Sequence, residues 1–411
     1  MLTHWIRTAF RIRITTLAAG LTVAAAASLV GCQTDRSNHE KWVEQADNRY
    51  RNLRTGLIME MAQQHFDAGD LENAERAVGD ALEIDPTSAK LLTLAGRIKL
   101  ERGRLERAYH LFNMAIEQSP KNPEAHYFQG VVLQRWKRFD EAETQYKTAY
   151  EQRADNVGYL IAWAEMLVES GEIDRAIALL EEKVDYFEQS AGIRVSLGQL
   201  YLVNDQPEKA VSALREASVL APDHTQYREE LAMAHAAAGD HGEAIKLFGA
   251  LLAEHGEDKR PDLKRALADA CRAAGRDERA EELYVELARD HGDAGLWLTL
   301  AEMAYEKGDQ AGTLYAARRA TEADASKHGG YVLAGLVWQK RGNLDEALRQ
   351  FDRAAEMARG DAAPLILRGL ALQKAGKAAA AAEAYRRALD RQPDDPRVRR
   401  LLESVASADA S

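Results

Sequence analysis

Cysteine is nearly absent from this chain, with Cys32 and Cys271 as its 2 cysteines among 411 residues. A disulfide framework and a zinc site built on several thiolates are therefore excluded. Proline is also scarce, with 9 residues, and aromatic residues make up only 7%, which favours an all-helical chain. Acidic residues outnumber basic ones by 65 to 54, giving a net charge of −11. Nucleic-acid binding needs a surplus of cations, so this balance argues against it.

One apolar run, rich in Ala and Leu, lies near the N-terminus over residues 14–30. It follows a segment that carries arginines and no acidic residue, an arrangement typical of a secretory signal. The run ends in Leu29-Val30-Gly31-Cys32, which resembles the lipobox of bacterial lipoproteins. This resemblance implies that residues 1–31 are a signal peptide and that Cys32 is acylated and becomes the new N-terminus. The alternative is an uncleaved anchor helix with an incidental cysteine.

The residues after Cys32 bear on where the protein is sent. In the lipoprotein family an Asp at the next position tends to retain the protein in the inner membrane, and Gln33 stands there instead. The resemblance therefore implies the inner leaflet of the outer membrane, facing the periplasm. We expect residues 32–54 to form a lipidated tether and a lead-in helix, with Trp42 covering the apolar face of the segment that follows.

The rest of the chain repeats with a period close to 34 residues. A small residue recurs first, at Ala62, Gly96, Gly130, Ala164, Gly198, Ala232, Ala268, Ala301, Gly335 and Gly369. Seven residues later comes a glycine, at Gly69, Gly103, Gly171, Gly239, Gly275, Gly308, Gly342 and Gly376, with Lys137 and Asp205 as the two replacements. An alanine follows five residues on, at Ala74, Ala108, Ala142, Ala176, Ala210, Ala244, Ala280, Ala347 and Ala381, with Thr313 as its replacement.

Each recurring position has a physical role in a pair of helices. The first small residue lies where the partner helix crosses too closely for a large side chain. The glycine turns the chain between the helices, because it accepts the left-handed conformation that a helix end needs. The alanine lets the second helix pack against the first. Several copies end in proline, which stops the second helix; these are Pro86, Pro120, Pro222 and Pro393.

This pattern resembles the tetratricopeptide repeat, a helix–turn–helix unit of 34 residues. We count ten repeats over residues 55–395, namely 55–88, 89–122, 123–156, 157–190, 191–224, 225–260, 261–293, 294–327, 328–361 and 362–395. The resemblance implies an all-α, right-handed superhelical solenoid, closed by a capping helix and polar tail over residues 396–411. Repeat 4, with Lys183 and Glu188, and repeat 8, with Thr313, depart from the pattern. We expect looser packing or a bend at both.

Residues that could carry chemistry are few. No catalytic domain fits outside the signal and the repeats, and no zinc-protease, phosphate-loop or dinucleotide-binding motif occurs. His235 and His241 are interpreted as ordinary helix and turn residues. Cys271 falls on the core side of a first helix, where a thiol packs as a small hydrophobe. We therefore expect no enzyme activity, no catalytic residue, no metal, no cofactor and no small-molecule substrate.

In the family, the concave face of the solenoid is lined by defined positions of each first helix. Those positions here hold Arg97, Tyr127, Val131, Gln134, Ile161, Glu165, Gln199, Tyr305, Val332, Leu336, Ile366 and Leu370. Apolar residues interleaved with Gln and Tyr suit an extended peptide. Tyr127 and Ile161 occupy equivalent positions and are expected to be exposed to the groove. The alternative for any of these residues is that it packs on the neighbouring repeat.

These features favour a lipid-anchored periplasmic scaffold that binds envelope proteins or peptide segments and performs no chemistry. A lipobox followed by tandem repeats is similar to the pilotins of type IV pili and to lipoproteins of tight-adherence (Flp) pilus assembly. That similarity implies an accessory role in a pilus or secretion system. The alternative within the same class is a scaffold for peptidoglycan or outer-membrane biogenesis.

Overall fold

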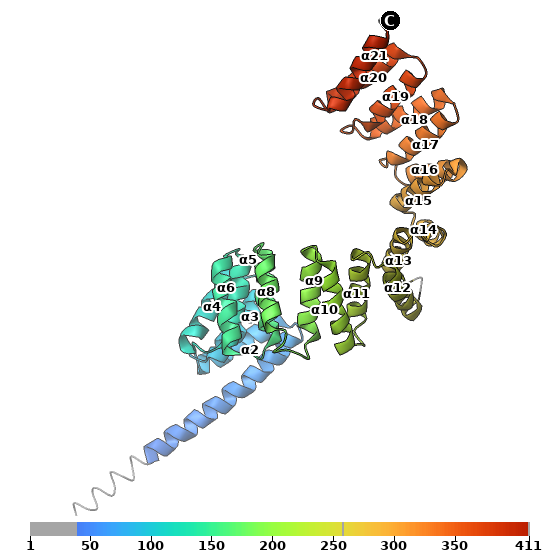
Figure 1. Cartoon of the computed structure of the whole chain (residues 1–411). Coiled ribbons are helices and arrows are strands. Elements are labelled where there is room, and N and C mark those ends of the chain that lie inside the picture. The colour runs from blue at the N-terminus through green and yellow to red at the C-terminus, as the bar shows by residue number, and fades with distance from the viewer. Residues whose placement is uncertain (1–38, 257–258, 410–411) are drawn as a thin grey trace, which may run out of the picture. The chain divides into compact units, whose positions relative to one another are not determined.

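The computed structural model describes residues 39–256 and 259–409. In this part of the chain the regular elements are α-helices and no strand occurs, which confirms the all-α class. Helices follow one another as antiparallel pairs that pack side by side in chain order (Figure 1). The predicted signal peptide, Cys32 and the residues up to 38 lie outside the described residues.

The chain divides into two compact parts, one ending at Lys183 and one beginning at Val184. In the N-terminal part, residues 39–67 are helical and are followed by α2 (Leu71–Ile84), α3 (Ala89–Glu101), α4 (Leu105–Gln118), α5 (Pro123–Arg135), α6 (Phe139–Gln152), α7 (Val157–Glu169) and α8 (Ile173–Lys183). The C-terminal part contains α9 (Ala191–Val203), α10 (Pro207–Leu220), α11 (Thr225–Ala237), α12 (His241–His255), α13 (Pro261–Ala273), α14 (Asp277–His291), α15 (Ala294–Glu306), α16 (Gln310–Ala323), α17 (Gly329–Lys340), α18 (Leu344–Met357), α19 (Ala363–Lys374), α20 (Ala378–Arg391) and α21 (Pro396–Asp409).

The division falls in repeat 4, where the sequence departs from its pattern. Helix α8 has 11 residues, whereas the equivalent helix α6 has 14. Turns occupy residues 184–189, so the helix ends at Lys183, which stands where other repeats have a small residue, and before Glu188, which stands where several others have proline. The loss of those residues shortens the second helix of this repeat.

The glycine that follows each first helix adopts the left-handed backbone conformation that the sequence predicted. All eight recurring glycines have φ between 69° and 89°. Among the described residues, the non-glycine residues with positive φ are Lys137, at 59°, and Asp205, at 54°, which are the two replacements. The turn geometry is therefore kept even where the residue that favours it is lost.

The first recurring small residue lies where two helices cross. A Cβ atom added at Gly96 would lie 2.4 Å from the ring of Phe112, and one at Gly369 would lie 2.4 Å from the ring of Tyr385. The bulky partners are fully buried, as are the equivalent Phe248 and Phe351. At these crossings a large residue of the second helix fills the space above the small residue of the first helix, whereas repeat 8 has the small Ala317 at the equivalent position.

The recurring alanines are completely buried in all nine repeats that have them. Thr313, which replaces alanine in repeat 8, is also completely buried, and its hydroxyl donates to the carbonyl oxygen of Asp309 at 2.6 Å. Thr313 is therefore packed as tightly as the alanines at the same position of the other repeats. A threonine fits because its hydroxyl is satisfied by the preceding turn of its own helix.

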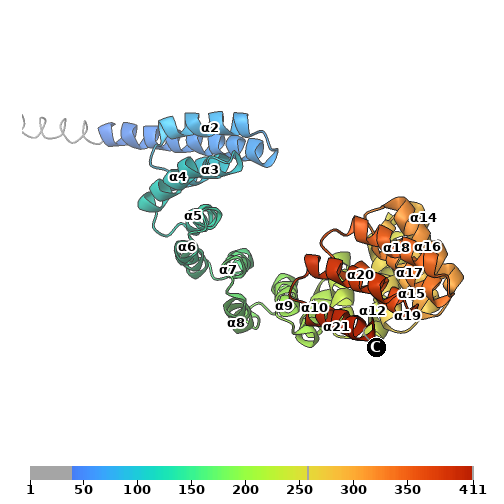
Figure 2. The ribbon, with the colours of Figure 1, turned by 90° about the horizontal axis from the view of Figure 1, so that it is seen from above.

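The two ends of the described chain are covered differently. At the C-terminal end, α21 buries Val398 and Val405 in a cluster with Tyr385 and Ala388 of α20. At the other end, Figure 2 shows α2 lying along the helix of residues 39–67, whose Ala62 packs against it. The prediction that Trp42 covers an apolar face is wrong, because Trp42 is 69% exposed. The lead-in segment continues the first helix without a break, so its side chains extend away from the repeat instead of folding back onto it.

Candidate protein-binding face

The twelve residues that the sequence assigned to a groove all lie on first helices, and none of them is buried. Six belong to the N-terminal part: Arg97, Tyr127, Val131, Gln134, Ile161 and Glu165. Six belong to the C-terminal part: Gln199, Tyr305, Val332, Leu336, Ile366 and Leu370. Glu165, Gln199 and Leu370 are exposed, and the other nine are half-buried. Each part is described separately below.

Tyr127 is packed against other rings and is not the freely exposed side chain that the sequence predicted. Its ring centroid lies 4.9 Å from that of Phe128, 5.7 Å from that of Tyr146 and 5.1 Å from that of Tyr159. Burial raises the pKa of Tyr127, and the carboxylate of Glu165 adds to the rise. The sequence could not predict this packing, because the rings come from three different helices, α5, α6 and α7. Tyr127 therefore stabilises the packing of repeats 3 and 4.

Arg97 is also held by partners within the chain. Its Nη1 lies 3.0 Å from Oε1 of Glu124 at the start of α5. Its guanidinium carbon lies 4.6 Å from the centroid of Phe66 and 5.1 Å from that of Phe128. A guanidinium between two aromatic faces is favoured by cation–π attraction. Arg97 thus joins the first helices of three consecutive repeats.

The glutamines on this face form hydrogen bonds from one repeat to the next. Gln134 accepts a hydrogen bond from the hydroxyl of Tyr146 at 2.6 Å and donates to Glu169 at 2.5 Å. In the C-terminal part, Gln199 donates to the carboxylate of Glu230 at 3.0 Å. These bonds fix the amide groups of the glutamines. A bound peptide would therefore meet polar groups that are already oriented.

The apolar residues of the C-terminal part line three successive first helices, α15, α17 and α19. Leu336 and Ile366 pack partly against core clusters, which leaves the remainder of each side chain at the surface. Leu370 is 38% exposed. This row of half-buried aliphatic residues presents an apolar surface to solvent.

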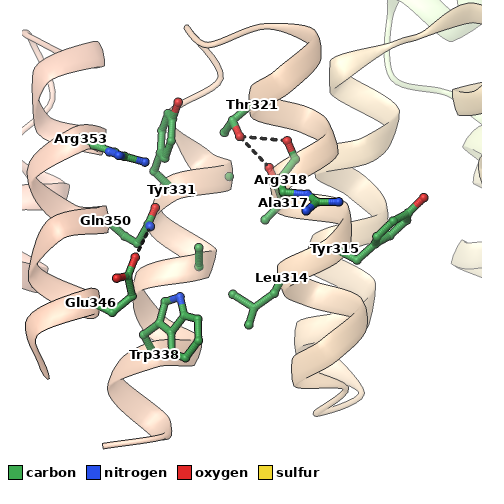
Figure 3. A pocket seen from close by; sticks show the side chains of 12 residues that line it. Leu314, Tyr315, Ala317, Arg318, Thr321, Tyr331, Trp338, Glu346, Gln350 and Arg353 are labelled. Carbon is green, nitrogen blue, oxygen red and sulfur yellow. Dashed lines mark hydrogen bonds between the residues drawn. The ribbon is translucent and has the colours of Figure 1, made fainter. Parts of the chain in front are cut away.

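A pocket of 470 Å³ lies elsewhere in the C-terminal part, between α16, α17 and α18 (Figure 3). Its lining residues are Leu314, Tyr315, Ala317, Arg318, Thr321, Gly330, Tyr331, Ala334, Trp338, Glu346, Gln350 and Arg353. Most of them belong to second helices, whereas the predicted groove lies on first helices. None of them was selected from the sequence.

The pocket combines apolar walls with fixed charges. Trp338 and Leu314 lie at one end, and Tyr331 lies beside Arg353 at the other (Figure 3). Glu346 accepts a hydrogen bond from Gln350 at 2.7 Å. The pKa of Glu346 is lowered, first by its hydrogen bond from Arg349 and then by that from Gln350. An apolar side chain with a polar end would fit such a lining.

One signal for this pocket was present in the sequence, as the pair Gly329-Gly330. A Cβ atom at Gly330 would lie 2.8 Å from the carbonyl oxygen of Ala317. Glycine therefore permits the close approach of α17 to α16 at one side of the pocket. The other lining residues lie on one face of each helix, at the ordinary helical spacing of three, four and seven residues, which is shared by all the helices and so does not single out this pocket.

Residues that could perform chemistry are satisfied within the fold. Cys271 is buried, and burial raises the pKa of its thiol. His235 is buried as well, with Nδ1 at 3.0 Å from Oδ2 of Asp240. Among residues 39–256 and 259–409, no group of three or more His, Cys, Asp or Glu side chains is placed to hold a metal ion. In the same residues, no helix combines the length and apolar character needed to span a bilayer.

Comparison with known proteins gives relatives at low identity. A segment of 287 residues, 69% of this chain, is 20% identical to 47% of a TPR repeat-containing protein of Methanocaldococcus jannaschii. A segment covering 40% of this chain is 25% identical to 31% of the BBSome complex member BBS4 of Bos taurus. The chain thus spans less than half of the length of each of these two curated relatives. The crystal structure of a thermophilic TPR protein from Thermus thermophilus matches 44% of this chain and 98% of its own, at 20% identity and a TM-score of 0.37.

Family models match much more of the chain. One tetratricopeptide repeat model matches residues 65–132, 167–234 and 235–304, and a second matches residues 332–396. The matches cover more than half of the chain, and they fall on the helix pairs whose glycine turns and small-residue crossings are described above. Proteins of this kind are generally scaffolds for protein–protein interaction. The chain belongs to the tetratricopeptide repeat family.

Proposed function

We propose that this protein is a non-enzymatic scaffold that holds segments of other proteins along the first helices of its repeats. The observation that carries this proposal is the row of half-buried aliphatic residues on α17 and α19, beside Gln373 of α19, whose amide oxygen accepts a hydrogen bond from the hydroxyl of Tyr385 at 2.8 Å. An extended peptide would cover the aliphatic residues and exchange backbone hydrogen bonds with such amides. No metal-binding cluster competes with that role in the described residues.

The finer proposal places this scaffold on a membrane by a lipid at Cys32, in the outer membrane and facing the periplasm. It rests on the sequence Leu29-Val30-Gly31-Cys32 and on Gln33 after it. Under this proposal the chain serves an envelope machine, with pilus or secretion-system assembly as the sharper version. Peptidoglycan or outer-membrane biogenesis is the alternative, and the genes beside this one would distinguish the two.

The anchor is tested by Cys32→Ala in cells given labelled palmitate. We expect wild type to incorporate label and to fractionate with outer membranes, and the variant to do neither while keeping its helical circular dichroism. Absence of label in wild type, or membrane fractionation of the variant, would show that the anchor proposal is wrong.

The binding face is tested by crosslinking in membranes, followed by mass spectrometry of the captured proteins. Val332→Ala with Leu370→Ala changes the face in the C-terminal part, and Ile161→Ala with Glu165→Ala changes it in the N-terminal part. Because a few central contacts dominate most interfaces, we expect at least one pair to weaken capture about tenfold or more.

The matched control removes comparable apolar area from second helices. Val219 on α10 is 74% exposed and Met357 on α18 is 47% exposed. Val219→Ala with Met357→Ala should therefore leave both capture and stability unchanged. If neither first-helix pair reduces capture relative to this control, the first helices do not form the binding face.

A further inference from the structure

The helix of residues 39–67 has a second apolar face that nothing in the described chain covers. Its members are Trp42, Tyr50, Leu53, Leu57 and Met61, each of which is at least 54% exposed. Val43 and the small residue Ala46 are exposed on the same helix. Large apolar side chains rarely gather on a solvent-exposed surface without a partner.

Helical periodicity places these residues together. At 3.6 residues per turn, residues 42, 43, 46, 50, 53, 57 and 61 fall within an arc of about 100°, the width of an ordinary buried stripe. The residues that pack into repeat 1, Thr55 and Ala62, lie on the opposite side and are buried. The helix therefore has one face in the core of its own repeat and a second face directed away from it.

The position of this face in the repeat explains why it is apolar. Leu57 and Met61 occupy the third and seventh positions of repeat 1. The residues at these positions in repeats 2, 7 and 8 are Leu91, Ala95, Leu263, Leu267, Leu296 and Leu300, and all of them are buried. In a solenoid such positions are covered by the preceding repeat. Among the described residues no repeat precedes repeat 1, so this face has no neighbour there.

We propose that a second copy of this chain covers this face by antiparallel pairing of the two helices. Val43, Ala46, Tyr50, Leu53 and Leu57 are separated by alternating steps of three and four residues, which is the spacing of a two-helix seam. In the antiparallel register that aligns these seams, Ala46 meets Leu57 of the second copy and Tyr50 meets its Leu53. Trp42 and Met61 then lie on opposite flanks of the seam.

The charges beside the seam favour the antiparallel direction. Asp47 and Arg54 lie seven residues apart on the same flank. Antiparallel pairing places Asp47 next to Arg54 of the second copy, and the two-fold axis repeats that pair. Parallel pairing would instead place Arg49 next to Arg54 of the second copy, which is repulsive. Flanking charges of this kind set the partner and the direction of a helix pair.

The seam also accounts for the helical state of residues 39–54. All sixteen of these residues are exposed in the single chain. An unpacked helix of this length is marginal in water, so a partner helix would supply the burial that it lacks. From residue 42 to residue 61 the seam would run for about 30 Å at 1.5 Å per residue.

A lipid surface is the competing occupant, and the charge pattern favours it less. Helices that lie on membranes carry a polar face rich in Lys and Arg. Here the acidic residues Glu40, Glu44 and Asp47 precede the basic residues Arg49, Arg51 and Arg54 along the exposed helix, with Lys41 among the acidic ones. This mixed pattern suits a helix partner of complementary charge. The pairing does not depend on the proposed binding face, so either can fail alone.

The test uses cysteine crosslinking of the full chain in the membranes of cells that produce it. Two differently tagged chains are co-produced, one with Ala46→Cys and the other with Leu57→Cys, and are oxidised without reductant. We expect a disulfide-linked dimer containing both tags. Neither variant alone should form a dimer above wild type, because in the antiparallel register each position faces the other and not itself.

The flanking charges provide the second arm. Asp47→Arg should reduce the yield of the crosslinked dimer about tenfold, and adding Arg54→Asp should restore it, since the pair is then reversed. Glu44→Arg makes the same charge change away from the seam and should have little effect. Restoration by the double change cannot be explained by misfolding of the single variant.

Three outcomes would overturn the proposal. Dimers formed by each cysteine variant with itself would mean parallel pairing. Absence of any crosslink would mean that a second copy does not cover the face. Protection of Leu53→Cys from a water-soluble maleimide in membranes that yield no crosslink would assign the face to lipid.

Discussion

At the scale of single residues, Lys137 and Asp205 hold a conformation that suits glycine. Their φ values of 59° and 54° match those of the recurring glycines. The left-handed region costs an L-residue about 1–2 kcal/mol, so replacing such a residue by glycine should stabilise the folded state. Part of this stabilisation is offset because glycine also makes the unfolded chain more flexible. Lys137 and Asp205 therefore leave these two turns less stable than glycine would.

We expect Lys137→Gly to raise the free energy of unfolding by roughly 1 kcal/mol. Asp205→Gly should give a smaller gain, because Asp tolerates the left-handed region better than Lys. Urea denaturation followed by circular dichroism would measure both. The reverse change, Gly103→Lys, serves as the control and should destabilise; a neutral result there would mean that the turn does not demand this conformation.

The crossings at Gly96 and Gly130 differ in the room that they leave. A Cβ atom would lie 2.4 Å from Phe112 at Gly96 but 3.2 Å from Tyr146 at Gly130. We expect Gly96→Ala to lower the free energy of unfolding by about 1–3 kcal/mol through overpacking. Gly130→Ala should be close to neutral, because the helix propensity of alanine offsets a small shift of the ring. Equal midpoints for the two variants in thermal denaturation would contradict this ranking.

The small residues were predictable from the sequence because backbone sterics act locally. A turn that needs positive φ selects glycine, and a close helix crossing selects alanine, so the same residue type recurs at the same position of most repeats. The environment of Tyr127 was not predictable in this way. Two of its three ring partners, Tyr146 and Tyr159, come from neighbouring helices, and only tertiary packing decides that the ring turns toward them instead of toward solvent.

At the scale of helices, α2 and α3 are joined by a cluster of charges around Glu75. Its carboxylate pairs with Lys99 and lies 2.5 Å from Arg102 and 3.9 Å from Arg104. The pKa of Glu75 is lowered, first by the hydrogen bond from Lys99. A carboxylate with a lowered folded-state pKa contributes stability above its unfolded pKa and loses it as the pH falls through the folded value.

Glu75→Gln should therefore destabilise the protein at pH 7 and have less effect near pH 3. Denaturant titrations of wild type and variant at both pH values would measure the difference. Glu72 forms an exposed ion pair with Arg76, so Glu72→Gln is a matched control with little expected effect at either pH. A loss of stability for Glu75→Gln that is independent of pH would rule out the ion pairs as its cause.

Helices and their turns were predictable, but the faces that they present to each other were predictable only in part. Trp42 is on a helix, as expected, yet its side chain is exposed. The prediction was wrong because a sequence alone does not show whether an apolar face packs on its own chain or on another molecule. The pocket beside Trp338 was missed for a related reason. Its walls are one face each of α16, α17 and α18, and the repeat pattern does not distinguish these faces from those of the other helices.

At the scale of the whole molecule, the division after Lys183 predicts independent unfolding. In repeat proteins, the free energy of unfolding is approximately the sum of the stability of each repeat and the energies of the interfaces between neighbouring repeats. A destabilising substitution therefore promotes unfolding only of the repeats that are continuously packed against the altered one. Gly130→Leu overpacks a crossing in the N-terminal part. We expect amide protection to fall across α3 to α8 and to change little across α9 to α21.

Hydrogen exchange followed by mass spectrometry would measure this, with Gly335→Leu as the mirror variant in the C-terminal part. Its crossing is tight as well, with 2.5 Å from the added Cβ atom to Phe351. This variant should lower protection in the C-terminal part and spare the N-terminal part. Loss of protection throughout the chain in either variant would mean that the two parts unfold as one cooperative unit.

The buried thiol of Cys271 gives this molecule a kinetic reporter that needs no engineering. The side chain is 1% exposed, and its raised pKa keeps it protonated at neutral pH. Only a thiolate that has reached solvent can be alkylated. The rate at which Cys271 is alkylated therefore reports how often the helix pair α13–α14 opens to solvent. We expect the rate to rise with Gly335→Leu if opening spreads along the C-terminal part, and to remain that of wild type with Gly130→Leu.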